Sequence, residues 1–122
     1  MAAASDPAPE NAPDSFLAER RAWVRYPAAI DGACQPLVQG SINQLWPARI
    51  SDLSARGVGL TLDTPIGVNS LISVELPRVG GTDARRLLAR VVRVADAGQG
   101  RWCLGCTFSI RLSDRELQEF LP

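Results

Sequence analysis

Three arginines near the start of the chain form the first group of side chains that could bind a ligand. Arg21 and Arg25 lie four residues apart in the run Arg-Ala-Trp-Val-Arg, and Arg20 directly precedes them. A guanidinium can bond phosphate oxygens in a bidentate way, stack on a purine face and donate to the O6/N7 edge of guanine. Taken alone, however, such a group is also typical of a solvated basic turn.

A second run combines a carboxylate, a hydroxyl and a glycine. Asp52, Ser54 and Gly57 follow one another at spacings of two and three residues. Asp52 can accept hydrogen bonds from N–H groups, and Ser54 is a small donor and acceptor. Gly57 permits a backbone conformation or a close approach that a Cβ would block. Alone, this run is equally typical of a strand that ends in a turn.

Together the two runs resemble the RxxxR and [D/N]xSxxG motifs of the PilZ domain family, and the resemblance covers roughly residues 19–120. It implies a six-stranded antiparallel β-barrel with a short C-terminal helix. It also implies a non-catalytic receptor for cyclic di-GMP, a bacterial second messenger with two phosphates and two guanines. In the family the arginine motif lies on an N-terminal segment, here residues 19–27, which wraps over the ligand and signals to an effector protein.

The resemblance assigns a role to each motif position. Arg21 and Arg25 would bind the phosphates and one guanine, while Asp52, Ser54 and Gly57 would seat the base. An arginine directly before the motif often accompanies an intercalated pair of ligands. Arg20 occupies that position here, so we expect two ligands per chain.

Composition excludes several other classes of function. Thirteen basic residues balance thirteen acidic ones, so net charge gives no sign of a surface for a nucleic acid polymer. The absence of histidine removes Ser-His-Asp catalysis and imidazole metal ligands. Cys103 and Cys106 lie three apart in a predicted strand and so point to opposite faces; we expect buried thiols, not a metal site. The sequence predicts no enzyme, no cofactor and no metal.

The chain is long enough for one domain, which we place at residues 16–122. Residues 1–15 are rich in Ala, Pro and acids, lack the features of a signal peptide and predict a disordered tail. No stretch approaches the roughly 18 apolar residues of a membrane span. An odd number of cysteines without a secretory signal indicates reduced thiols. We therefore expect a cytoplasmic protein.

Periodicity indicates a chain of short strands. Apolar residues alternate within 57–62, 71–76 and 102–108, and Gly- or Pro-containing turns separate these segments. Residues 86–94 are ambiguous because both faces carry aliphatic side chains. Strict alternation would also place Ile50 on the same face as Asp52, so we predict a bulge or strand end near Ser51. Ser113 and Glu116 have the spacing of a capping box, which predicts a terminal helix.

Two alternatives to a ligand receptor stay open. A barrel of this kind could be a ligand-independent interaction module in which the motifs are remnants. A small β-barrel could also bind RNA or single-stranded DNA, although zero net charge and few strand aromatics argue against it. The effector and the oligomeric state are left open by the sequence.

Overall fold

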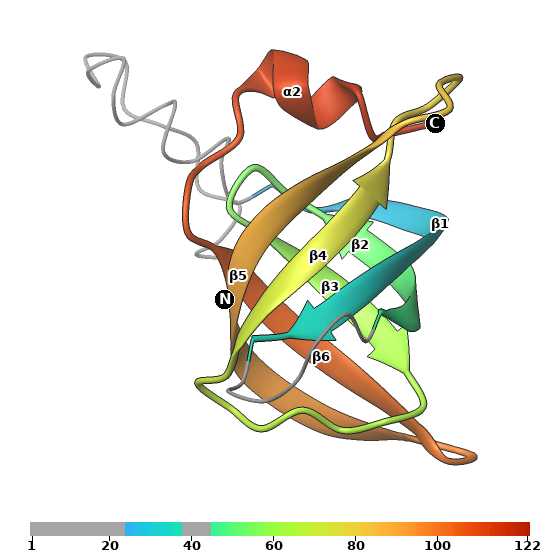
Figure 1. Cartoon of the computed structure of the whole chain (residues 1–122), viewed down its shortest axis with the longest axis vertical. Coiled ribbons are helices and arrows are strands. Elements are labelled where there is room, and N and C mark those ends of the chain that lie inside the picture. The colour runs from blue at the N-terminus through green and yellow to red at the C-terminus, as the bar shows by residue number, and fades with distance from the viewer. Residues whose placement is uncertain (1–23, 38–44) are drawn as a thin grey trace, which may run out of the picture.

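A computed structural model describes residues 24–37 and 45–122 as a closed antiparallel barrel with the strand order β1-β2-β3-β6-β5-β4 (Figure 1). The predicted six strands and C-terminal helix are confirmed. The tail 1–15, Arg20, Arg21 and most of the segment 19–27 lie outside the described residues. The elements are β1 (Tyr26–Pro36), β2 (Trp46–Leu53), β3 (Gly57–Leu62), β4 (Leu71–Pro77), β5 (Ala84–Gly98), β6 (Arg101–Phe108) and α2 (Asp114–Gln118).

Period-two alternation builds the barrel core. Each predicted stripe points inward, except that Trp102 is only half-buried. The ambiguous segment 86–94 is the middle of β5, whose outer face keeps Leu88 and Val92 exposed. Because these two exposed residues are aliphatic, periodicity alone could not show which face of this strand points into the core. The largest fully buried side chains are Phe120, Ile50, Leu53, Leu60, Leu62, Ile72, Leu76, Leu104, Leu112, Val58, Val74 and Val91.

Of the four register shifts between described strands, two change which face a charged side chain occupies. The register between β2 and β3 shifts between Ile50 and Asp52, which confirms the irregularity predicted near Ser51. The register between β5 and β6 shifts between Val91 and Arg93. A bulge inserts one extra residue, so the side chain that follows it points to the opposite face from the one strict alternation gives. Asp52 and Arg93 consequently lie on the outer surface, while Leu53 points into the core.

The two inner cysteines behave as apolar side chains, and the third does not. Cys34 and Cys106 are buried free thiols, and desolvation raises their pKa values to about 11 and about 12. Cys103 is exposed, with its Sγ 3.8 Å from the Thr61 hydroxyl. The prediction of a buried thiol was therefore wrong for Cys103. Cys103 and Cys106 do point to opposite faces of β6, as strand alternation predicts.

Helix α2 covers one end of the barrel, and the β5–β6 turn projects beyond the opposite end (Figure 1). The predicted capping box is present: Ser113 Oγ accepts from Glu116 N at 3.1 Å, and Glu116 Oε1 accepts from Ser113 N at 2.9 Å. Leu117 and Phe120 are buried against the core cluster. No helix in the described ranges is long and apolar enough to cross a membrane.

We expect the capping box to make stability depend on acid pH. The hydrogen bond from Ser113 and the contact with Arg85 at 2.5 Å lower the pKa of Glu116 from 4.5 to about 2. A carboxylate with a lowered pKa stabilises the folded state above its unfolded pKa and loses that contribution as pH falls through its folded pKa. Thermal melts of Glu116→Gln and wild type should therefore differ most near neutral pH and converge between pH 4.5 and about 2. A pH-independent difference would contradict this, because glutamine keeps the cap and removes only the charge.

Candidate functional site

The structure brings one residue from each sequence motif together on the outer face of the barrel. Arg25 directly precedes β1, and its Nη1 donates to Asp52 Oδ1 at 2.5 Å. The two side chains are 49% and 33% exposed, so a ligand from solvent can reach both. Exposed pairs of this kind stabilise a fold by only about 0–1 kcal/mol. The pair can therefore open for a ligand without loss of the fold.

Gly59 leaves the space into which the Asp52 side chain leans. Asp52 pairs with Gly59 across β2 and β3, and a Cβ on Gly59 would lie 2.9 Å from Asp52 Cγ. The oxygen that faces Gly59 is Oδ2, which accepts no hydrogen bond from residues 24–37 or 45–122. One carboxylate oxygen thus holds Arg25, and the other is free to accept from a ligand. Sequence reasoning missed Gly59, because its position opposite Asp52 is set by the register between β2 and β3.

The Ser54 hydroxyl serves the turn between β2 and β3. Its Oγ accepts from Gly57 N at 3.0 Å and from Arg56 N at 3.2 Å, and it donates to Gly57 O at 3.3 Å. Ser54 is 2% exposed. This network fixes the turn that follows Asp52, which is the strand-end arrangement that the sequence also allowed. A ligand contact by Ser54 stays a prediction.

Gly57 allows a close approach, and the group that approaches is the neighbouring strand. Gly57 pairs with Thr107 on β6, and a Cβ would overlap the backbone carbonyl oxygen of Cys106. Gly57 is buried, and its φ is not positive. The glycine is thus required by packing between β3 and β6. Any contact with a ligand would come in addition.

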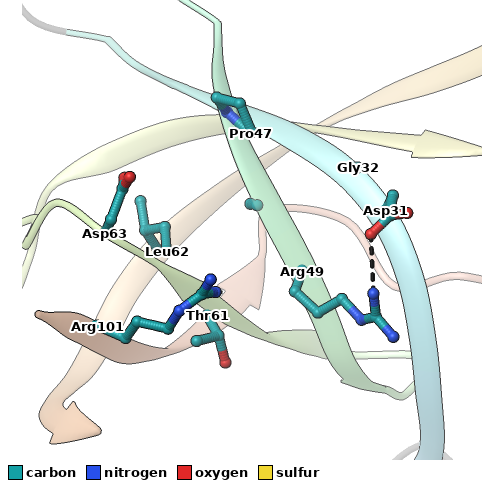
Figure 2. A pocket seen from close by; sticks show the side chains of 9 residues that line it. Asp31, Gly32, Pro47, Arg49, Thr61, Leu62, Asp63 and Arg101 are labelled. Carbon is teal, nitrogen blue, oxygen red and sulfur yellow. Dashed lines mark hydrogen bonds and ion pairs between the residues drawn. The ribbon is translucent and has the colours of Figure 1, made fainter. Parts of the chain in front are cut away.

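A pocket of about 450 Å³ is lined by residues of β1, β2, β3 and β6 (Figure 2). Arg49 and Arg101 stand on either side of it, and Arg49 Nη1 donates to Asp31 Oδ1 at 3.1 Å. Asp63 adds a second carboxylate, so the two positive charges are balanced within the pocket. None of the predicted site residues that the structure describes lines it. The exposed Arg25–Asp52 pair is therefore separate from this pocket.

The described residues offer no metal centre. Residues 24–37 and 45–122 contain no group of three or more Cys, Asp or Glu side chains arranged to hold an ion. Arg20 and Arg21 lie outside the described residues. The site geometry therefore rests on Arg25, Asp52 and the turn that Ser54 and Gly57 form.

The described residues thus form a closed six-stranded barrel that carries an exposed arginine–aspartate pair on its outer face. The PilZ domain family model matches residues 19–121, so the chain belongs to the PilZ domain family. The match covers both motifs from which the resemblance was first drawn. No curated protein sequence matches the chain.

Solved structures of bacterial proteins share the fold. The PilZ domain of YcgR from Escherichia coli, determined with c-di-GMP, is 22% identical with a TM-score of 0.59, covering 84% of this chain and 88% of that one. The Bacillus subtilis inhibitor of motility MotI/DgrA is 19% identical with a TM-score of 0.59, covering 84% and 48%. MrkH, a c-di-GMP-dependent transcription regulatory factor, is 18% identical with a TM-score of 0.53, covering 77% and 45%. The chain thus spans about half the length of MotI/DgrA and MrkH.

Proposed function

We propose that this protein is a non-catalytic cytoplasmic receptor for cyclic di-GMP. The observation that carries the proposal is the Arg25–Asp52 pair, which joins the two motifs on an exposed face in a chain of the PilZ domain family. The c-di-GMP in the YcgR PilZ structure supports the choice of ligand. The alternative, a ligand-independent interaction module, predicts the same fold without binding.

The two partners of the pair would bind different parts of the ligand. Asp52 Oδ2 would accept from the N–H groups on the Watson–Crick edge of guanine, where adenine offers a poorer match. A phosphate would compete with Asp52 for the Arg25 guanidinium and bond it in a bidentate way. Each charge-assisted bond contributes roughly 1.5–3 kcal/mol. Several of them, less the cost of ordering, give micromolar affinity or better, about −8 kcal/mol.

Signalling would follow from the position of the arginine motif ahead of β1. Binding would draw the segment 19–27, with Arg20 and Arg21, onto the barrel face beside Asp52. This ordering would create a surface for an effector protein, as order–disorder switches do. Arg20 before the motif favours an intercalated pair of ligands, which predicts a stoichiometry of two.

Calorimetric titration of the full chain with cyclic di-GMP and, separately, with cyclic di-AMP tests the function. We expect micromolar or tighter binding of the guanine ligand and much weaker binding of the adenine ligand. Asp52→Ala should remove most of this discrimination, because only the guanine edge donates to the carboxylate. The absence of both heat and thermal shift with cyclic di-GMP would reject the receptor function in favour of the interaction module.

Gly59→Ala is expected to weaken cyclic di-GMP binding at least about tenfold, the loss of one charge-assisted bond. The added methyl group would occupy the space of the Asp52 carboxylate and turn it away from its present position. The displaced atoms are the end of a side chain, so we expect a small change in melting temperature. Gly67→Ala is the matched control, since the nearest atom to its Cβ, Ser70 Oγ, would lie at 3.7 Å. Equal affinities of the two variants would contradict this role of Gly59.

A further inference from the structure

Four residues form one row across the outer face of the barrel. Asp52 on β2 pairs with Gly59 on β3, Gly59 pairs with Gly105 on β6, and Gly105 pairs with Arg93 on β5. The two central residues have no side chain, so the row is a platform without side chains between an acid at one end and a base at the other. Along the curved wall of the barrel its ends are about 14 Å apart at Cα, or three strand spacings of about 4.8 Å. A cyclic dinucleotide has dimensions of this order.

The two charged ends depend on the two bulges. Without the shift after Val91, alternation would turn Arg93 toward the core; with it, Arg93 is exposed on the outer face. The bulge on β2 does the same for Asp52. Bulges often re-aim a side chain beside a functional site. Two of them at opposite ends of one register row indicate a common site.

Arg93 lies over the platform and has no partner among the described residues. A Cβ on Gly105 would be 3.5 Å from Arg93 Nε and 3.6 Å from its Nη2, so the guanidinium rests above this glycine. Within residues 24–37 and 45–122 it makes no ion pair and no side-chain hydrogen bond. By contrast, Arg86 on the same strand pairs with Glu75, and Arg90 donates to the carbonyl of Asn69. Arg93 is therefore available to an anion on the platform.

We propose that Arg93 is a further ligand-binding residue of this site, a cation held by the barrel wall that contacts a phosphate of the bound cyclic dinucleotide. The proposal rests on the proposed function. It adds a contact outside both sequence motifs and outside the N-terminal segment. The ligand would then lie across β3 and β6, between the Arg25–Asp52 pair and Arg93.

Calorimetry with cyclic di-GMP on the full chain tests the proposal through three variants. Arg93→Ala should weaken binding about tenfold, the effect of losing one charge-assisted bond. Arg93→Lys should recover most of the affinity, because a phosphate accepts from an ammonium as well. Arg86→Ala removes the same charge from the same strand face and should bind as wild type does. Thermal melts of Arg93→Ala should match wild type, since no described partner is lost.

The outcomes separate this proposal from the function on which it rests. If wild type binds and Arg93→Ala binds equally well, the Arg93 contact is rejected and the receptor function stands. If Arg93→Lys is as weak as Arg93→Ala, a phosphate contact is rejected. If wild type does not bind cyclic di-GMP, both the receptor function and the Arg93 contact are rejected.

Discussion

Arg25→Ala should lower the affinity for cyclic di-GMP at least about tenfold, because it removes a bidentate, charge-assisted contact with phosphate. Asp52→Ala should lower the affinity by a similar factor, because it removes the carboxylate that accepts hydrogen bonds from the Watson–Crick edge of guanine. The double variant should lose less than the sum of the two single losses, since residues in direct contact are not energetically independent. Titration calorimetry of the four proteins measures each affinity and the coupling between the two sites.

Arg49→Ala is the control for this cycle. Arg49 on β2 forms a comparable exposed ion pair with Asp31 on β1, with 3.1 Å between Nη1 and Oδ1. Both variants remove one positive charge and one surface ion pair, so both should fold with little loss of stability. Only Arg25→Ala should lose the ligand. Similar affinities for Arg25→Ala and Arg49→Ala would contradict the placement of the site.

Gly57→Ala should cause the largest loss of stability of any variant considered, about 3 kcal/mol or more. A Cβ at this position would overlap the backbone carbonyl oxygen of Cys106, and a backbone atom inside a paired sheet cannot move aside as a side chain can. Chemical denaturation monitored by circular dichroism measures the free energy of unfolding. The motif glycine would then be explained by packing between β3 and β6.

Gly67→Ala serves again as the reference for this measurement, because its added methyl group would make only an ordinary contact. If Gly57→Ala unfolds at the same denaturant concentration as Gly67→Ala, the packing explanation is wrong. The presence of glycine in the motif would then be better explained by a close approach of the ligand to the Gly57 backbone.

Much of the fold could be predicted from local pattern. The stripes around Leu60, Val74 and Leu104 and the capping box at Ser113 follow directly from alternation and from helix-capping chemistry. Barrel closure came from the resemblance, since strand order depends on pairing between distant segments. The sequence did not show which face of 86–94 points inward, because the exposed Leu88 and Val92 are as apolar as the residues of the inner face.

The candidate site was predictable in part. The bulge on β2 could be predicted, because strict alternation would place Ile50, a core residue, on the same face as Asp52, a site residue. The sequence left two interpretations of Ser54 open, a ligand contact and a turn at the end of the strand, and the structure shows its hydroxyl in the turn. The proposed contribution of Arg93 could not be predicted from the sequence, because Arg93 is related to Asp52 only through Gly59 and Gly105 in the register of four strands.

Co-crystallisation of the chain with cyclic di-GMP tests the central claim most directly. We predict a guanine whose Watson–Crick edge donates to Asp52, with a phosphate bonded by Arg25, on the outer face of β2 and β3. A dinucleotide seated elsewhere, for example in the pocket between Arg49 and Arg101, with the Arg25–Asp52 pair intact, would contradict it.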